Sequence, residues 1–585
     1  MTSAISLKFF APVVLAAMAG AAVSQDAKNV ILMISDGAGI TTWQAANQWQ
    51  FGADAGTGPE FRQRWENEFT QHWMTAFPGH TQPVPPSLTG GQLIPLSLFE
   101  GLVFPEFGSY DPAAAWDATP GLVNLVDDDN GTLGRGTPVT LAPNPFLPAD
   151  FLPLFQLVSA GFNIVSTDGF AAYDYLVTRS VTDSAAAGTA LASGVKSYNS
   201  TINFDLNEQP VPFITQEMVA RGKAAGVVST KEFTDATPAA FGTQSPARSE
   251  EAFISTQMIR NGLLDVIISP GHPEFGSGGV PRPASYGVVS EEDFLALRGG
   301  LDGWTLVETA SGLEAIADGT APAPERLFGF VPVSSSLNSR DTSARTNAYD
   351  PRFFDPADPN GAVPFVMPDL DTLSMTAINT LKRDEDGFFL MIEGASVDSA
   401  AHANDLPRLV EEQLAFNRAI DRVIDWVETE SSWDETLVII TTDHANGLLL
   451  GPDSATEFMQ PPQATGVGEL PEVLWWSTNH TNELVPLWTR GPGGELFGRL
   501  TDGFDPVRGR YIDNSDVFRV MSASIGVACN AADLAGPVFT LDLDDVDAFI
   551  VGFLAADPIA DLTGDGAYDM LDVDAFIALF LSGCP

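Results

Sequence analysis

The segment Val181–Gly194, with the sequence VTDSAAAGTALASG, places a serine hydroxyl at the start of an alanine-rich stretch. Alanine favours helix, so the sequence predicts a helix that begins at Ser184, directly after Asp183. The first N–H groups of a helix lack partners and form the positive end of its dipole, which suits an anion such as phosphate. A serine is a weak nucleophile at neutral pH unless a base or a metal ion activates it. The segment therefore predicts a nucleophile whose activator comes from elsewhere in the chain.

Candidate activators recur just after apolar runs. Asp36 follows Asn29–Ser35, and Asp443 and His444 follow Leu437–Ile440. Carboxylate oxygens and imidazole nitrogens are ordinary ligands of zinc, whereas magnesium prefers oxygen alone. Further runs of this kind are Phe388–Ile392 before Glu393, Ala225–Ser229 before Asp235 and Thr237, and Phe162–Ser166 before Asp168.

Two further histidines lie near acids or in loops. Asp398 and His402 are four residues apart, so one helical turn would bring both side chains onto one face. His480 lies in the polar stretch Trp476–Thr481. Each pair alone could be a surface or capping pair, but the whole set indicates a metal centre.

The apolar runs are typical of strands buried in a parallel sheet, and amphipathic stretches such as Leu406–Glu428 lie between them. This alternation predicts an α/β sandwich with a mainly parallel sheet. Such sheets bind ligands at the carboxyl ends of their strands, where the polar residues fall. Tyr511–Gly526 predicts a terminal helix, capped near Asn514 or Ser515.

The motifs together resemble the alkaline phosphatase family, and their order and wide spacing match it too. The resemblance covers roughly residues 29–526, without most of 79–150. The matching motifs are DG at 36–37, TDSA at 182–185, DATPA at 235–239, EGASVD at 393–398 with His402, and DH at 443–444.

The resemblance implies a three-layer α/β/α sandwich, a homodimer, and hydrolysis of phosphate monoesters through a phosphoserine on Ser184. Arg248 would grip the phosphate, Asp183 would orient Arg248, and Asp235 would favour magnesium through its waters. The implied ligands are Asp398, His402 and His480 for one zinc, Asp36, Asp443 and His444 for a second zinc that touches the Ser184 oxygen, and Asp36, Thr237 and Glu393 for magnesium.

The chain departs from the family pattern at two places. Ala38 stands where the family often has methionine, and residues 399–401 lack the lysine or histidine that some members place there. The remaining histidines, His72, His80 and His272, match no motif and are interpreted as structural or surface residues.

Two alternatives stay open beside the phosphomonoesterase. Ser184 is followed by three alanines, which disfavours a sulfatase, because sulfatases need a Cys/Ser-x-Pro-x-Arg context. A phosphodiesterase of the same superfamily is the nearer alternative. The other is a non-catalytic protein that binds phosphate or a partner.

The chain has 585 residues, with 76 acidic against 28 basic side chains and a formal charge of −48. Such a charge argues against partners such as nucleic acid or anionic lipid. Residues 1–24 resemble a signal peptide, with Lys8, an apolar run and a small-residue cleavage site, so export is expected. No later run is long enough to predict a membrane span.

The predicted catalytic domain spans residues 25–527 and carries an insertion at about 79–150. This insertion is rich in Pro, Phe, Gly and Leu and has weak periodicity. It is interpreted as a cover over the site or over an interface.

Residues 528–585 predict a small helical module, because Asp545–Leu554 recurs as Asp572–Leu581. Cys529 and Cys584 bracket the repeat, and a disulfide is expected in an exported chain. The stretch 561–572 is close to an EF-hand calcium loop and resembles a dockerin repeat, although a bare acidic turn fits as well. The module could dock a protein or attach to a surface. Its candidate calcium ligands are Asp561, Thr563, Asp565, Asp569 and Asp572.

Overall fold

The computed structural model describes most of the chain. The described residues are 26–83, 108–126, 164–276, 279–336, 368–500, 502–526, 532–534, 541, 543–555, 560–563 and 567–582. The signal segment, both cysteines and Asp565 lie outside them, so the expectations about those residues stay predictions. In the part of the chain that is described, no helix has the length and apolarity to cross a membrane.

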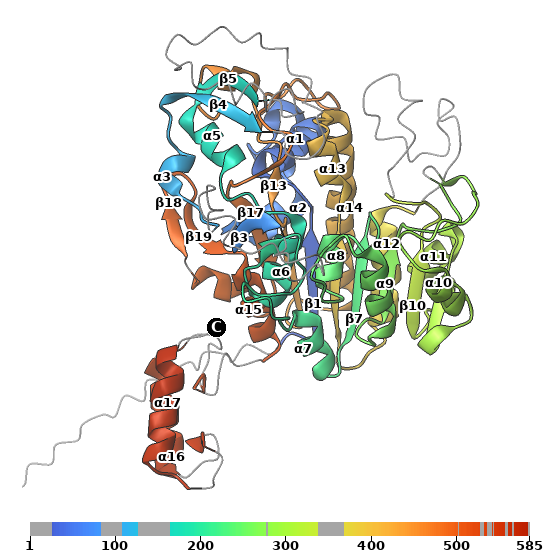
Figure 1. Ribbon diagram of the computed structural model, residues 1–585, viewed down its shortest axis with the longest axis vertical. Helices are drawn as coiled ribbons and strands as arrows, with labels where there is room; N and C mark the ends of the chain where they lie inside the picture. The colour runs from blue at the N-terminus through green and yellow to red at the C-terminus, as the bar shows by residue number, and fades with distance from the viewer. Residues whose placement is uncertain are drawn as a thin grey trace, which may run out of the picture.

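An eleven-stranded sheet forms the centre of the fold (Figure 1). From β12 to β9 every neighbouring pair is parallel, whereas β17 pairs antiparallel with both β12 and β2. The mainly parallel sheet is therefore confirmed. In spatial order the strands are β18 (Gly503–Asp505), β19 (Gly509–Asp513), β2 (Thr70–Thr75), β17 (Val485–Arg490), β12 (Thr436–Thr441), β1 (Asn29–Ile34), β11 (Phe388–Glu393), β7 (Ala224–Ser229), β8 (Val266–Ser269), β10 (Arg326–Phe330) and β9 (Trp304–Val307).

Helices cover both faces of the sheet and complete the three layers. Successive side chains of a strand point to opposite faces, so Val30 and Leu32 enter one apolar core and Ile31 and Met33 enter the other. The first core receives α6 (Ser184–Ser193), α7 (Ile214–Ala220), α8 (Ala236–Ala240), α9 (Glu251–Arg260), α10 (Glu291–Arg298) and α15 (Ser515–Ser524). The second receives α1 (Ile40–Phe51), α2 (Arg64–Glu68), α11 (Ala310–Ala317), α12 (Leu370–Leu381), α13 (Ser396–His402) and α14 (Leu406–Glu430).

One predicted strand lies elsewhere. Phe162–Ser166 was expected to end at the same sheet edge as the other runs, with Asp168 at the site. Instead β5 (Ile164–Phe170) pairs antiparallel with β4 (Pro120–Val126) in a separate two-stranded sheet, and Asp168 lies inside this pairing. The run Ile164–Phe170 has polar residues at its centre, so it is not the continuous apolar run of a strand buried on both faces.

The described part of the predicted insertion packs against the catalytic body. The Tyr110 hydroxyl and the Trp116 Nε1 both donate to Asp505 Oδ2, at 2.7 and 2.6 Å. Asn482 Nδ2 donates to the Ser109 carbonyl oxygen at 2.8 Å. Residues 108–118, which include α3 (Pro112–Ala115), therefore lie beside the loop that carries His480.

Two helices lie in the C-terminal region in which the repeat predicts a small module. They are α16 (Leu543–Ala555) and α17 (Met570–Ser582). The rings of Phe549 and Phe576, which are equivalent in the repeat, stack with centroids 4.2 Å apart. Their apolar cluster contains no residue of the main cores.

Candidate active site

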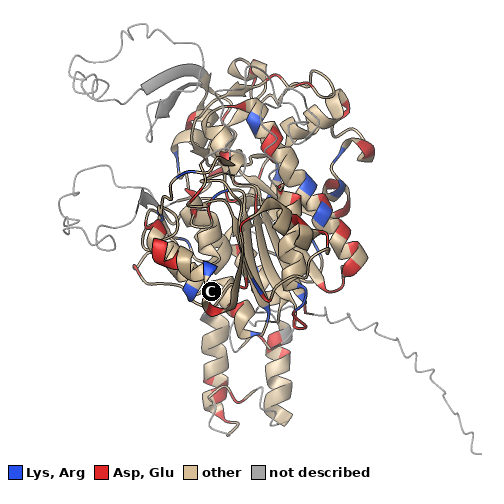
Figure 2. Cartoon of the chain, turned by 90° about the vertical axis from the view of Figure 1, so that its right-hand side faces the viewer, with Lys and Arg blue, Asp and Glu red and all other residues tan. Residues whose placement is uncertain are grey.

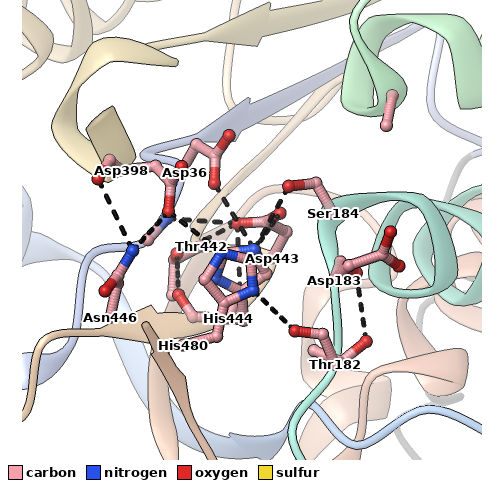
Figure 3. Close-up of polar contacts among 12 residues, drawn as sticks. Asp36, Thr182, Asp183, Ser184, Asp398, Thr442, Asp443, His444, Asn446 and His480 are labelled. Carbon is pink, nitrogen blue, oxygen red and sulfur yellow. Dashed lines mark hydrogen bonds and ion pairs between the residues drawn. The ribbon is translucent and has the colours of Figure 1, made fainter. Parts of the chain in front are cut away.

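The site lies where neighbouring central strands end at one level. Ile34 at the end of β1 is in register with Thr441 of β12 on one side and Glu393 of β11 on the other, and Glu393 is in register with Ser229 of β7. Side chains just beyond these positions therefore converge, and Figure 3 shows several of them turned toward a common centre.

Close loop packing brings Asp36 and Asp398 together. Gly37 has φ +74°, and a Cβ there would lie 2.8 Å from the Asp398 Cα and 2.9 Å from its Oδ1. Any side chain at this position would push the two loops apart, which explains the glycine after Asp36. The Gly37 N–H also donates to Asp443 Oδ1 at 3.2 Å, so the β1 and β12 loops are joined.

Ser184 is the first residue of α6, as the sequence predicts. Asp183 is its N-cap, and Asp183 Oδ1 accepts a hydrogen bond from the Ala186 N–H at 3.0 Å. The Ser184 Oγ lies 3.2 Å from His444 Nε2 (Figure 3). The hydroxyl is thus buried between a helix N-terminus and the histidine-carboxylate group.

Asp36, Asp443 and His444 form the first group that could hold a metal ion, with ligand atoms within 4.8 Å of one another. His444 Nε2 lies 3.6 Å from Asp36 Oδ1 and 3.2 Å from Asp443 Oδ2. Neither of these buried oxygens accepts a hydrogen bond from a described residue. Buried carboxylates without donors are costly, so this donor set fits a metal ion.

Asp398, His402 and His480 form the second group. His402 Nε2 and His480 Nε2 lie 3.4 and 3.3 Å from the two Asp398 oxygens and 3.1 Å from each other. The Nδ1 atoms lie 2.6 Å from the carbonyl oxygens of Thr478 and Thr182. Donation from Nδ1 to a carbonyl leaves the Nε2 lone pair for a metal, so the group has the orienting partners of a metal site.

The two groups adjoin. The His444 and His480 rings stack with centroids 3.6 Å apart, and Asp398, His444 and His480 also bring ligand atoms within 4.8 Å. Asn446 was not anticipated from the sequence, and its Nδ2 donates to Asp398 Oδ1 at 2.7 Å.

Crowded carboxyls perturb the electrostatics of the site. Burial, and then the neighbouring Asp443, raise the pKa of Asp36. Burial raises the pKa of Asp443 to about 6, and burial together with Asp235 raises that of Glu393 to about 8. Burial would lower the pKa of His402, but the Asp398 charge outweighs it and raises that pKa to about 9. These shifts indicate a cluster that lacks positive charge.

Glu393 and Thr237 supply oxygen ligands on the α8 side of the site, where α8 packs against β11. Glu393 Oε2 accepts from the Ser229 hydroxyl at 2.5 Å, whereas Glu393 Oε1 and Thr237 Oγ1 are buried without a partner. The family resemblance groups these two oxygens with Asp36, and such an all-oxygen donor set would fit magnesium better than zinc.

Arg248 lies between two acids. Its NH1 is 3.2 Å from Asp183 Oδ2, and its NH2 is 2.9 Å from Asp235 Oδ1. Asp235 Oδ2 in turn lies 2.6 Å from the Nζ of Lys231. Sequence reasoning missed Lys231, although its position four residues before Asp235 could have drawn attention to it.

The remaining histidines lie apart from these groups. His72 is on β2, where burial lowers its pKa to about 4, and His80 is the first residue of β3 (His80–Pro83). His272 follows β8 and forms a third possible ligand group with Glu274 and Glu308. Arg298 donates to both glutamates, at 2.6 and 2.7 Å, so this group already has a cation of the chain between its carboxylates.

Comparison with known proteins agrees with the geometry. A family model described as alkaline phosphatase matches residues 165–465. Alkaline phosphatase 4 of Bacillus subtilis is 26% identical over 388 residues, covering 56% of this chain and 75% of the relative. The alkaline phosphatase of Escherichia coli is 27% identical over 368 residues, covering 59% and 74%.

A solved structure, the cold-active alkaline phosphatase from a psychrophilic Shewanella species, shares the fold. Its TM-score is 0.51 at 19% identity, over 85% of this chain and 99% of that chain. Asp36 and His480 lie outside the segment matched by the family model, and the fold brings both to the matched residues. This chain is therefore an enzyme of the alkaline phosphatase family.

Proposed function

We propose that the enzyme hydrolyses phosphate monoesters through a phosphoserine on Ser184, with two zinc ions and one magnesium ion. The observation that carries the proposal is the Ser184 Oγ at a helix N-terminus, 3.2 Å from His444, whose ring lies beside the buried oxygens Asp36 Oδ1 and Asp443 Oδ2 that accept no hydrogen bond from a described residue. The three ligand sets are those expected from the family: Asp398, His402 and His480; Asp36, Asp443 and His444; and Asp36, Thr237 and Glu393.

When bound, the metal ions would supply the positive charge that lowers the pKa of the Ser184 hydroxyl and stabilises the attacking and leaving oxygens. The chain's own residues bind and orient the substrate. The α6 N-terminus offers backbone N–H groups to the phosphate, and Arg248 offers a guanidinium that can grip two oxygens. Asp183 and Asp235 hold that guanidinium from either side.

The reaction has two displacements at phosphorus. The deprotonated Ser184 Oγ forms a bond to phosphorus while the ester P–O bond breaks, and the alcohol leaves with a proton from water. A water molecule then attacks the phosphoserine, its proton passes to solvent, and inorganic phosphate leaves as the Ser184 Oγ–P bond breaks. Separating one slow hydrolysis into two such steps is the benefit of a covalent nucleophile.

The test compares Ser184→Ala with Ser193→Ala, a buried serine near the other end of the same helix. Ser184→Ala should lower hydrolysis of an aryl phosphate monoester by about 10³-fold or more while bound zinc is retained, and Ser193→Ala should not. Full activity of Ser184→Ala would refute the nucleophile. A faster rate on an aryl diester than on the monoester would favour the phosphodiesterase alternative.

Export and a homodimer belong to the same proposal and rest on the signal-like residues 1–24 and on the family. The formal charge of −48 disfavours a polyanionic partner such as nucleic acid. Figure 2 shows the acidic positions in red, spread over the helices and loops of the chain with the basic positions in blue among them.

We further propose that the C-terminal module is a separate domain that binds calcium at 561–572 and docks a protein or a surface. Thr563 N and Oγ1 both donate to Asp572 Oδ1, at 3.1 and 3.0 Å, and Asp569 N donates to Asp572 Oδ2, which closes the loop. Exposed apolar side chains on both helices, among them Leu554 and Leu581, support docking. Calorimetric titration with calcium, against an Asp561→Asn variant, tests the ion.

A further inference from the structure

Lys231 is a partly buried cation that belongs to none of the family motifs. It lies two residues beyond the end of β7, and its Nζ is 2.6 Å from Asp235 Oδ2. The other Asp235 oxygen is 2.9 Å from Arg248 NH2. Asp235 is therefore shared between two cations, one at each carboxylate oxygen.

The chain of charges continues to the nucleophile. Arg248 NH1 lies 3.2 Å from Asp183 Oδ2, and Asp183 Oδ1 caps the helix that begins at Ser184. Positive and negative groups thus alternate from the β7 loop to α6. Removing the Lys231–Asp235 pair would change the charge balance at Arg248 and Asp183.

The guanidinium of Arg248 gains a defined orientation from this arrangement. Each terminal nitrogen carries two N–H bonds and gives one of them to an acid, so among the described residues one N–H on each nitrogen stays without an acceptor. Two free N–H bonds on one planar group match two phosphate oxygens. If Asp235 took both terminal nitrogens, the guanidinium would turn away from Asp183 and lose this orientation.

Lys231 competes with that bidentate pairing, because its ammonium already lies 2.6 Å from Asp235 Oδ2. The charge of Lys231 acts most strongly on Asp235, whose ionised form it favours. It also lowers the pKa of Glu393 and that of Asp36, against the larger effect of burial, which raises both. Residues 399–401 bring no cation to the segment between Asp398 and His402. Lys231, in the loop after β7, supplies positive charge to Asp398 instead.

We infer that Lys231 is a positioning residue for phosphate binding: it holds Asp235 Oδ2, so that Asp235 Oδ1 and Asp183 keep Arg248 oriented toward the anion. The inference rests on the proposed function for the identity of the anion. Some members of the family carry a cation at the positions of residues 399–401. In this chain Lys231, in the loop after β7, provides the positive charge.

A double-mutant cycle tests this role in the metal-loaded protein, with inorganic phosphate as the probe. Calorimetry gives the Kd for phosphate, and elemental analysis gives the bound metal. Lys231→Met should weaken phosphate binding about tenfold with the metal content unchanged, because a charge-assisted partner of Asp235 is lost. In an Asp235→Asn background the same substitution should change the Kd less than about twofold, because its target is gone.

Two variants separate positioning from folding. Lys231→Arg keeps the positive charge and should bind phosphate within about threefold of the wild type. Lys223→Met is the matched control, because Lys223 precedes the same strand and, within the described residues, donates only to the backbone carbonyls of Lys28 and Asp386, at 3.0 and 2.7 Å. It should leave the Kd unchanged.

Equal losses in both backgrounds would overturn the inference, since Lys231 would then act on the anion directly. Loss of metal in Lys231→Met, or an unchanged Kd, would overturn it too. The proposed function fails separately: a wild-type protein that binds phosphate without hydrolysing monoesters would leave the role of Lys231 intact.

Discussion

Two clusters of histidine and carboxylate residues follow strands of the same sheet. The first cluster is Asp36, Asp443 and His444, and the second is His272, Glu274 and Glu308. Of these two, the first has the features of a metal centre. In the first, Asp36 Oδ1 and Asp443 Oδ2 are buried beside His444 without a donor. In the second, Glu274 and Glu308 lie beside His272, but Arg298 donates to both carboxylates.

Both ring nitrogens of the histidine in the second cluster also have partners. His272 Nε2 lies 2.9 Å from Glu308 Oε1, and His272 Nδ1 accepts from the Glu274 N–H at 3.1 Å. Ligand type and spacing are therefore insufficient to identify a metal site. The two clusters differ in burial and in counter-charge, because Asp36 and Asp443 are buried without a cation from the chain, whereas Glu274 and Glu308 are partly exposed and paired with Arg298.

The largest expected effect comes from removing one histidine from each cluster. His444→Asn should lower bound zinc by one equivalent and kcat/KM for a monoester by about 10²–10³-fold or more, because a ligand beside the nucleophile is lost. His272→Asn should leave both quantities unchanged. Elemental analysis of the purified variants and steady-state kinetics provide the measurements.

Loss of a metal equivalent from His272→Asn would contradict the comparison, because it would make the second cluster a metal site. Chelation of the wild type gives an independent check. It should lower the Tm by about 5 °C or more and abolish activity, with recovery on added zinc and magnesium.

Sequence patterns predicted much of the first cluster, because each ligand follows a recognisable strand or lies on a helix at i, i+4 spacing. The register of β12, β1 and β11 then brings Asp36, Glu393 and Asp443 together without further information. The same reasoning failed for Asp168, because β5 pairs with β4 outside the central sheet and its polar centre departs from the apolar pattern of the central strands.

Long-range pairings account for what could not be predicted. His480 reaches the site through the short pairing of β13 (Ala445–Asn446) with β16 (His480–Thr481), in which Asn446 is opposite His480. The role of Lys231 depends on Arg248 arriving from a later loop. Arg298 likewise lies on a helix remote in sequence from His272. No periodicity along the chain encodes these contacts.

A smaller effect is expected at Glu483, a carboxyl whose Oε1 is buried without a partner and which belongs to neither cluster. Burial raises the pKa of Glu483 to about 7, from a usual value of 4.5. A raised pKa means that the carboxyl favours folding below about pH 4.5 and that this contribution is lost as pH rises through about 7.

Glu483→Gln keeps the shape and removes the charge, so it should stabilise the protein by roughly 2 kcal/mol at pH 9 and change little at pH 5. Thermal unfolding at both pH values measures the difference. Stabilisation of equal size at pH 5 would mean that the gain comes from packing rather than from ionisation.

The smallest effect should follow from Arg298→Met, which removes the internal cation of the second cluster. Because Arg298 is about one-third exposed, solvent screens its pairs, and the loss of stability should be only about 1 kcal/mol. The variant would, however, leave His272, Glu274 and Glu308 as three ligands without a counter-charge, which is the condition of the first cluster.

Zinc added to the metal-loaded Arg298→Met protein should therefore raise its Tm and bind as one additional equivalent in equilibrium dialysis, whereas wild type should take up none. Arg260→Met is the matched control, because Arg260 pairs with Asp293, away from any histidine group. If Arg298→Met gains no more zinc than Arg260→Met, charge balance alone does not distinguish the two clusters. Ligand geometry would then be the feature that sets the catalytic group apart.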